Sequence, residues 1–494
     1  MQIPFDNRYI TLGEAFFAKV RPTPVKRPEL IRFNDALAGA LGISTDQVAA
    51  TGAAVFSGNT VPEGAEPLAM AYAGHQFGHF NPQLGDGRAL LLGEINAPDG
   101  ARYDIHLKGS GRTRFSRDGD GRSALGPVLR EYLVSEAMAK LRVPTTRALA
   151  AVTTGEPVAR ERLLPGGVIT RVASSFVRVG TFEYFAARDD YDAVKQLADY
   201  VIEKSYPQVS HSENPYATFL TAVVDRQAAL IAQWMHLGFI HGVMNTDNMS
   251  IAGETIDYGP CAFMDAYRHD QVFSSIDRHG RYAYSNQPAI GLWNLTRLAE
   301  ALLPLLDEDP QAAVKVAHEV LEGYAQRYAS DWLAGMRAKC GLTACSGAEG
   351  DADKALVGAL LDVMADNHAD FTLTFYYLSR LAYQRSERDN DLRNLFDNPA
   401  QIDAWLDKWR KRLSLETQTD KARQESMQAV NPVYIPRNHQ IEAAIRAAED
   451  HGDFSVFHEL HAVLQNPYVQ QQGKQRYMQA PEPEEVVQVT FCGT

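Results

Sequence analysis

The sequence predicts an α+β protein in which a strand-rich half precedes a helix-rich half. Two observations predict this class. Residues 84–108 contain apolar runs separated by Gly-rich turns, and Ile105 and Leu107 alternate with His106 and Lys108 as in a half-buried strand. From about residue 191 to residue 465, by contrast, helical patterns dominate. An arrangement of this kind leaves a natural cleft between the two halves.

Individual elements follow from local patterns. Residues 127–141 place apolar side chains four positions apart behind a proline, which predicts a helix. Residues 165–185 read as further strand, and residues 215–237 form a long continuous helical pattern. We therefore expect an N-terminal extension over residues 1–65, a strand-rich unit over 66–190, and a helical unit over 191–494 that ends in a Cys-containing tail.

Composition excludes several classes of protein. The chain has 494 residues, 45% of them hydrophobic, and a formal net charge of −13. It is therefore neither disordered nor a general binder of nucleic acid or of anionic membranes. It contains no run of about 18 apolar residues and no leader-like N-terminus. We expect a cytoplasmic protein without a nucleic-acid or membrane partner, and the sequence gives no prediction of oligomeric state.

The strongest chemical signal lies in residues 238–260, GFIHGVMNTDNMSIAGETIDYGP. His241, Asn248 and Asp257 follow the order of the catalytic loop and the metal-binding segment of kinase-like folds. Asn248 and Asp257 offer hard oxygen ligands one hairpin apart, which suits a Mg²⁺ that bridges nucleotide phosphates. Taken alone, the same residues also fit a simple hairpin with polar turns.

Upstream residues strengthen the kinase-like interpretation. A Gly-rich turn at Gly85 and Gly87, the strand residue Lys108 and the helix residue Glu131 come in the order that a kinase-like nucleotide lobe uses. Each has an ordinary structural explanation, but their joint occurrence before the 241–257 segment favours a two-lobed, protein-kinase-like fold. The strand-rich unit is then its nucleotide-binding N-lobe and the helical unit its C-lobe.

One position departs from that pattern. The residue two after the loop histidine, where a working phosphotransferase carries its proton-accepting Asp, is Val243. Valine cannot act as a general base. The chain is therefore either a silent nucleotide-binding module or an enzyme in which the neighbouring carboxylate of Asp247 has taken over the role.

Arginine is concentrated near the predicted nucleotide site. Residues 108–122 carry five basic and two acidic side chains in an otherwise acidic chain, and Arg88, Arg171 and Arg178 lie on neighbouring strand-like stretches. Guanidinium groups suit a polyphosphate because each can hold two oxygens and none deprotonates. A solvated basic face is the alternative explanation for the arginines of residues 112–122.

At these residues the chain resembles the selenoprotein O family of pseudokinase-fold protein adenylyltransferases. The motifs LGDGRALLLGE, HLKGSGRTRFSRDGDGR, LREYLVSEAM, HGVMNTDNMSI, IDYGPCAFMD, NPVYIPRNHQIE and QVTFCGT carry the likeness, from about residue 70 to the C-terminus. The resemblance implies that ATP binds in reverse, so that its α-phosphate faces the acceptor. The product would be AMP on a Ser, Thr or Tyr hydroxyl of a target protein.

The resemblance also implies roles for particular residues. Asp247 would accept the proton, Asn248 and Asp257 would hold Mg²⁺ or Mn²⁺, and Glu131 would position Lys108. The residues implied to contact ATP are Gly85, Gly87, Arg88, Lys108, Asp120, Gly121, Arg171, Arg178 and Asp257.

The resemblance further implies redox control through Cys492, paired with one of Cys261, Cys340 and Cys345. The sequence does not choose among these three. The pair His75 and His79 has a spacing compatible with zinc, but no third ligand is nearby, and we interpret both as loop-packing residues.

Three activities remain open at this point. Transfer of AMP, or of UMP from UTP, is the first. A kinase that transfers the γ-phosphate with Asp247 as base is the second, and a catalytically silent ATP-binding pseudokinase is the third.

Overall fold

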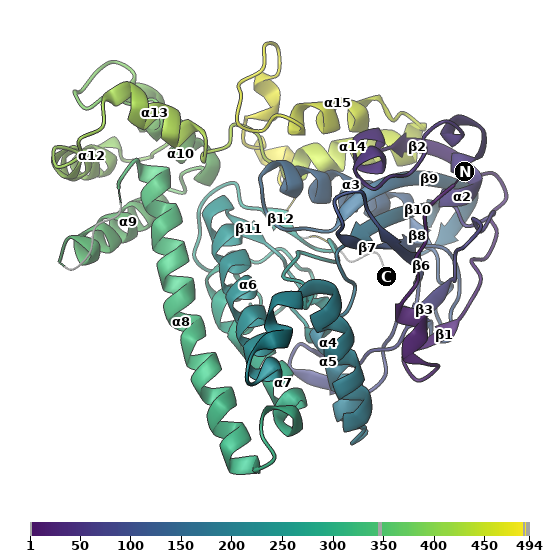
Figure 1. Ribbon diagram of the computed structural model, residues 1–494. Helices are drawn as coiled ribbons and strands as arrows, with labels where there is room; N and C mark the ends of the chain where they lie inside the picture. Colours follow the sequence, from purple (N-terminus) through teal and green to yellow (C-terminus); the bar gives the residue numbers. More distant parts are fainter. Residues whose placement is uncertain (1, 344–347, 488–489, 491–494) are drawn as a thin grey trace.

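The computed structural model describes residues 2–343, 348–487 and 490 and is built around one antiparallel sheet (Figure 1). The strands follow the order β1-β3-β6-β7-β10-β9-β2, and β8 pairs with β10. They are β1 (Phe17–Lys19), β2 (Glu29–Phe33), β3 (Leu68–Met70), β6 (Ala89–Asn96), β7 (Arg102–Lys108), β8 (Ser123–Ala124), β9 (Arg147–Ala159) and β10 (Leu163–Ala173).

Residues 1–65 contribute directly to this sheet. Strand β1 pairs with β3 in the register Phe17↔Met70, and β2 pairs with β9 in the register Glu29↔Thr153. The two strands of this segment therefore occupy the two ends of the strand order. Helices α1 (Asp35–Ala40) and α2 (Ala53–Phe56) add apolar side chains to a core that they share with β6, β7, β9 and β10.

Helix α3 (Leu125–Lys140) confirms the helix expected at residues 127–141. The pattern predicted one buried face, but the structure buries nearly every residue from Leu125 to Met138. The reason is that the C-terminal helices α14 (Asn438–His451) and α15 (Ser455–Leu464) return to pack on α3, as Figure 1 shows. Buried polar residues such as Glu131 therefore need partners inside the protein.

The expectation of strand throughout residues 165–185 is wrong in its second half. Strand β10 ends at Ala173, and Val179–Ala186 form helix α4. The aromatic residues in this stretch suggested a strand, but Phe182 and Phe185 are three positions apart and both are buried, as on one face of a helix. Arg178 is therefore the N-cap of α4 and not a strand residue.

The second half of the chain is helical, as predicted. Helix α6 (Pro215–Leu237) coincides with the predicted segment, because the Asn214 side chain caps its first turn and Gly238, at φ 67°, ends it. The other helices are α5 (Tyr191–Ser205), α7 (Gln287–Leu306), α8 (Pro310–Cys340), α9 (Ala348–Asp366), α10 (Phe371–Leu378), α11 (Asp389–Arg393), α12 (Pro399–Leu413) and α13 (Asp420–Gln428).

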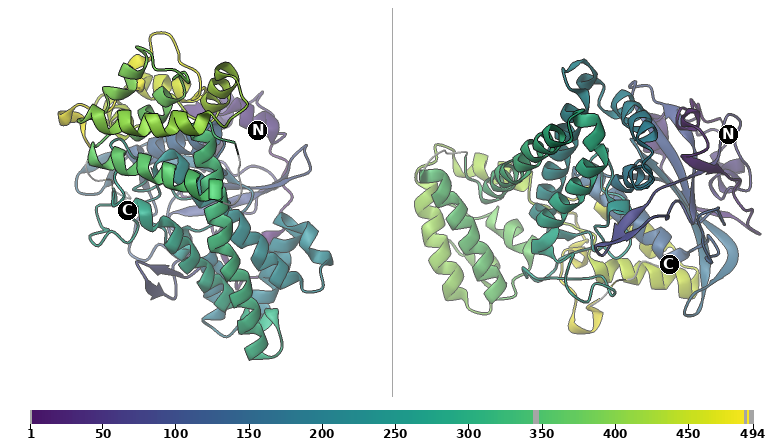
Figure 2. Two further views of the ribbon diagram at one scale, coloured as in Figure 1. Left: turned by 90° about the vertical axis from the view of Figure 1, so that its left-hand side faces the viewer. Right: turned by 90° about the horizontal axis from the view of Figure 1, so that it is seen from below.

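Helices α9 to α13 gather at the end of the molecule farthest from the sheet (Figure 2). They share a second apolar core with the end of α8, in which Trp405 and Trp409 are buried. No helix in the described part of the chain is both long and apolar enough to cross a membrane. The chain is thus a mixed protein of one strand-rich sheet and many helices, which confirms the predicted class at that level.

Two short two-stranded units complete the fold. The hairpin of β4 (Gly74–Gln76) and β5 (His79–Asn81) precedes the Gly-rich turn, and β11 (Phe239–Ile240) pairs with β12 (Ala262–Phe263). Between Asn248 and Asp257 the expected hairpin does not form. Instead, Ser250 bridges to Arg178 and Thr255 bridges to Thr145, so this segment is attached to the sheet-containing half.

Candidate active site

The Asp257 carboxylate is the centre of a cluster of cations. Its Oδ1 lies 2.6 Å from Arg171 Nη1 and 3.3 Å from Lys108 Nζ, and its Oδ2 lies 3.1 Å from Arg178 Nη1. Burial by itself raises the pKa of Asp257, but Arg178, Arg171 and Lys108 outweigh this effect and hold the pKa well below its usual range. Asp257 is therefore ionised at any physiological pH.

Glu131 of α3 connects the same cations from the other side. Its Oε2 accepts a hydrogen bond from Lys108 Nζ at 2.7 Å, and its Oε1 lies 3.2 Å from Arg171 Nη1. Burial raises the pKa of Glu131, yet Lys108 and Arg171 lower it below the ordinary value overall. The structure thus brings the strand lysine, the helix glutamate and Asp257 together, as the order of the motifs predicted.

A third carboxylate, Asp86, extends the cluster toward the Gly-rich turn. Its Oδ1 lies 4.0 Å from Arg178 Nη2, and its Oδ2 lies 3.2 Å from His106 Nε2. Arg171 Nη2 is 2.9 Å from His106 Nδ1. Burial lowers the pKa of His106 to about 4 despite the opposing charge of Asp86, so its imidazole is neutral near pH 7.

Neither His106 nor Asp86 was predicted from the sequence as a site residue. A signal was present for His106, because residues 106 and 108 of one strand point to the same face of a sheet. For Asp86 the position between Gly85 and Gly87 was the only indication.

Gly85 is constrained by its surroundings, since it adopts φ 79° and a Cβ there would collide with the Phe115 ring.

Residues 241–248 carry Asn248, which the sequence predicts as a metal ligand. His241 is buried, and its Nε2 lies 2.8 Å from the Ile256 carbonyl, which ties the segment to the residue before Asp257. Val243 is also buried, and its carbonyl accepts a hydrogen bond from Asn248 Nδ2 at 3.0 Å. The amide nitrogen is thus engaged, and the amide oxygen is the atom of Asn248 that could bind a metal ion.

Asp247 is joined to the cluster through Arg178. One guanidinium nitrogen, Nη1, lies 3.1 Å from Asp257 Oδ2 and donates to the Asp247 carbonyl at 2.9 Å. Asp247 is 7% exposed, its Oδ2 accepts from Gln76 Nε2 at 3.2 Å, and its Oδ1 has no hydrogen-bond partner. Burial raises the pKa of Asp247 to about 7 against the opposing charge of Arg178.

The β4–β5 hairpin covers Asp247. Backbone N–H groups of the hairpin donate to the preceding residues of the segment, from His75 to Thr246 Oγ1 at 2.7 Å and from Phe77 to Asn245 Oδ1 at 3.2 Å. His75 packs on the rings of Phe80 and Trp293 and contacts Glu183 through Nδ1, whereas His79 is exposed. The two histidines thus lie on a strand hairpin and not on one helical face, which is the arrangement that their spacing suggested for zinc. Sequence reasoning missed Gln76, for which adjacency to this histidine pair was the only signal.

The remaining predicted residues lie next to β6 and in the loop before β8. Arg88 immediately precedes β6, and its carbonyl accepts from Gly109 N at 2.7 Å, just beyond Lys108. Asp120 instead faces Arg160, at 2.9 Å, and its side chain is 44% exposed. Gly121 pairs with Gly111 in the same loop. Two arginines of residues 112–122 bind backbone carbonyls, Arg112 that of Gly119 and Arg122 those of Thr23 and Pro24.

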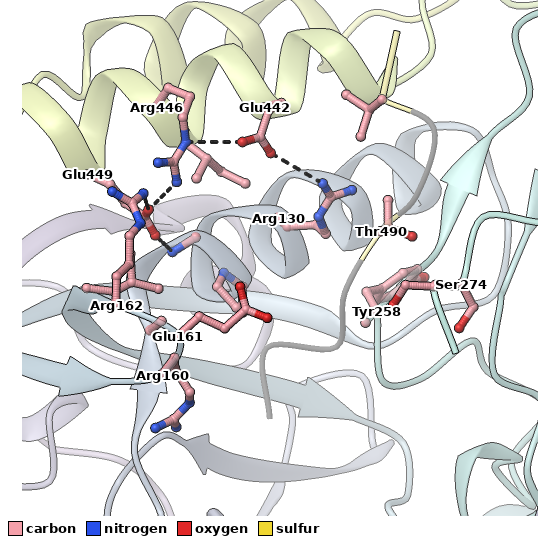
Figure 3. Close-up of a pocket in the computed structure, with 18 of the residues that line it drawn as sticks. Arg130, Arg160, Glu161, Arg162, Tyr258, Ser274, Glu442, Arg446, Glu449 and Thr490 are labelled. Atoms are coloured by element: carbon pink, nitrogen blue, oxygen red, sulfur yellow. Dashed lines mark hydrogen bonds and ion pairs between the residues drawn. The ribbon is translucent and has the colours of Figure 1, made fainter. Parts of the chain in front are cut away.

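A cavity of about 850 Å³ opens beside Tyr258 and Gly259, immediately after Asp257 (Figure 3). The start of α3, the β9–β10 turn, residues 274–276 and α14 form its walls. Its arginines are paired with carboxylates, as Figure 3 shows for Arg446 and Glu442 at 3.1 Å. Thr490 borders the cavity, and its backbone N–H donates to the Phe273 carbonyl at 2.8 Å.

Two of the four cysteines are placed by the structure. Cys261 and Cys340 are buried, and burial raises the pKa of the Cys340 thiol to about 12. Cys345 and Cys492 fall outside the described residues. The predicted redox role of Cys492 therefore stays a prediction.

The donor set at Asn248 and Asp257 fits a hard divalent cation. Within the described residues no group of three or more His, Cys, Asp or Glu side chains is arranged to hold a metal by itself. Mg²⁺ commonly takes one or two protein oxygens and completes its shell with phosphate and water. One carboxylate and one amide oxygen are therefore sufficient when a nucleotide is present.

The fold and this cluster define a mixed α and β protein with a buried site of two arginines, a lysine and carboxylates. A family model described as "Protein adenylyltransferase SelO" matches residues 1–465, and the chain belongs to this family. The predicted resemblance to selenoprotein O proteins, and with it the prediction of a nucleotidyltransferase enzyme, is confirmed.

Full-length relatives agree with this assignment. "Protein nucleotidyltransferase YdiU" of Rhizobium johnstonii is 59% identical over 491 residues, which cover 99% of this chain and 97% of that protein. The protein of the same name from Rhodopseudomonas palustris is 57% identical over 495 residues and 100% of both chains. That from Bradyrhizobium sp. strain BTAi1 is likewise 57% identical over 495 residues.

Proposed function

We propose that the chain is a protein adenylyltransferase that transfers AMP from ATP to a Ser, Thr or Tyr hydroxyl of a target protein. The observation that carries the proposal is the position of Arg178. Its guanidinium contacts both the Asp257 carboxylate and the Asp247 backbone. The cluster of cations and a carboxylate with an unpartnered oxygen thus lie side by side, an arrangement that would suit attack on a phosphorus atom.

The proposal includes a two-lobed, kinase-like arrangement. The N-lobe would comprise residues 66–190, preceded by the extension over residues 1–65, and the C-lobe residues 191–494. Supporting it, Lys108 and Glu131 form an ion pair in the sheet-containing half, while the 241–257 segment follows α6 in the helical half. The cluster at Asp257 joins the two halves.

Each part of the site has a distinct proposed role. Lys108, Arg171 and Arg178 would turn from their carboxylates to the phosphate oxygens of ATP, and Glu131 would keep Lys108 in place. Asn248 and Asp257 would hold Mg²⁺ or Mn²⁺, which neutralises phosphate charge when bound. The other proposed nucleotide contacts are Gly85, Gly87, Arg88, Asp120 and Gly121.

In the proposed reaction the acceptor hydroxyl oxygen attacks the α-phosphorus. The bond from the α-phosphorus to the oxygen that bridges it to the β-phosphate breaks, and pyrophosphate leaves with that bonding pair. Asp247 Oδ1 takes the hydroxyl proton. A carboxylate with a pKa of about 7 suits this task, because a general base works best with a pKa near the operating pH. The arginines stabilise the charge that grows on the pyrophosphate.

Two alternatives use the same site. A kinase would present the γ-phosphate to Asp247, and a silent pseudokinase would bind ATP without transfer. Val243 favours a silent pseudokinase, because it stands where a kinase carries its proton-accepting Asp. The enclosed carboxylate of Asp247 and the retained Lys108–Glu131 pair favour an active enzyme. Transfer of UMP from UTP would follow the same chemistry.

Labelled nucleotides test the proposal. The protein is incubated with divalent metal, a mixture of acceptor proteins, and ATP labelled at either the α- or the γ-phosphate. We expect label on protein only from α-labelled ATP, and loss of that label in Asp247→Asn with ATP binding retained. Protein labelled from γ-labelled ATP would instead show a kinase, and no labelling from either would show a silent module.

A further inference from the structure

The β4–β5 hairpin makes three hydrogen bonds with the segment that carries Asp247. His75 N donates to Thr246 Oγ1 at 2.7 Å, Gln76 Nε2 to Asp247 Oδ2 at 3.2 Å, and Phe77 N to Asn245 Oδ1 at 3.2 Å. Residues 75–77 of the hairpin thus donate hydrogen bonds to residues 245–247.

The contacts of the hairpin fix which carboxylate oxygen is free. Gln76 occupies Oδ2, while Oδ1 is buried and has no partner. The backbone of Gly74 lies so close that a Cβ there would be 2.5 Å from Oδ1. The hydrogen bond from Gln76 at Oδ2 and the close backbone of Gly74 at Oδ1 together restrict the Asp247 carboxylate to one orientation.

An aromatic contact supports the hairpin itself. Phe77 packs edge-on against Tyr282 with ring centroids 5.1 Å apart, and Tyr282 OH donates to Asn245 Oδ1 at 2.6 Å. The hairpin and the residues around Asp247 are therefore anchored to the same tyrosine. The amide of Gln76 is then presented to Asp247 from a supported backbone.

We propose that Gln76 is a positioning residue for the reaction, which orients the Asp247 carboxylate so that Oδ1 meets the acceptor hydroxyl. This inference rests on the proposed role of Asp247 as proton acceptor. The hairpin is correspondingly the acceptor-side wall of the site. Since Oδ1 is buried here, the acceptor must displace part of this wall when it binds.

Gln76→Met tests the role of the hydrogen bond, because methionine has a similar shape without an N–H donor. We expect kcat for AMP transfer to fall by about tenfold to a hundredfold, the range that corresponds to a lost hydrogen bond to a charged group. The KM for ATP should stay within twofold. The matched control is Gln83→Met at an exposed position of the same stretch, which should leave kcat unchanged.

Gln76→Leu repeats the test should the Met variant unfold at a lower temperature than the parent. A kcat within twofold of the parent in a folded variant would overturn the inference, because the amide would then not orient the base.

The double variant Gln76→Met with Asp247→Asn separates this inference from the proposed function. Asp247→Asn alone should lose transfer, and adding Gln76→Met should lower the residual rate no further, because Gln76 acts through Asp247. A further fall of the same size overturns the positioning role. Full transfer by Asp247→Asn would instead refute the proposed base, whatever Gln76→Met does.

Discussion

Gly74→Ala is expected to disable transfer while leaving the nucleotide cluster intact. The added Cβ would lie 2.5 Å from Asp247 Oδ1, 2.9 Å from its Cβ and 3.0 Å from its Cγ. Ordinary van der Waals contact begins at 3.4 Å, so Oδ1 must move by about 0.9 Å. A displacement of this size at a reacting group costs about a hundredfold in rate, and overpacking costs about 1–3 kcal/mol of stability.

The assay compares kcat for AMP transfer with the Kd for ATP in the same variant. We expect kcat to fall about a hundredfold and the Kd to change little, because the three atoms nearest to the added Cβ all belong to Asp247. Gly39→Ala in α1 is the matched control, since a Cβ there has no atom within 4 Å. Normal turnover by Gly74→Ala, or an equal loss in Gly39→Ala, would refute the reasoning.

Two further predictions concern binding and stability. Arg171→Lys should weaken ATP binding about tenfold, measured by calorimetry, because one ammonium cannot span Asp257 and His106 as the guanidinium does at 2.6 and 2.9 Å. An unchanged Kd would contradict this. Burial lowers the pKa of Lys339 to about 7, below its unfolded value near 10.5. Between pH 7 and pH 10 the unfolded state therefore binds more protons at Lys339 than the folded state does. The free energy of unfolding, measured in urea, should rise with pH over this range. In Lys339→Met this rise should be smaller, and an equal rise would exclude Lys339 as its cause.

The sequence predicted the parts of the site that follow one another in a fixed order. Lys108, Glu131 and Asp257 could be expected to meet, because a strand Lys, a helix Glu and a metal-binding Asp come in this order in kinase-like folds and act there on the same nucleotide. The structure brings these three together with Arg171 and Arg178. Helices α3 and α6 were also predictable, since their apolar spacing is continuous.

Contacts between distant segments could not be predicted from the sequence. Gln76 and Asp247 are 171 positions apart, and no pattern in either segment indicates the other. The helix α4 was mistaken for strand because a short aromatic run fits both periods, and only the packing of Phe182 and Phe185 decides between them. Likewise, α14 and α15 cover α3 although about 300 residues separate them in sequence.

Mass spectrometry of an acceptor protein after reaction with unlabelled ATP and metal tests the central claim most directly. If ATP binds in reverse against Lys108, Arg171 and Arg178, peptides of the acceptor should carry AMP on a hydroxyl side chain. The Asp247→Asn variant should yield no such peptides. Peptides that carry phosphate alone on the same side chains would contradict the account, because the γ-phosphate would then have faced Asp247.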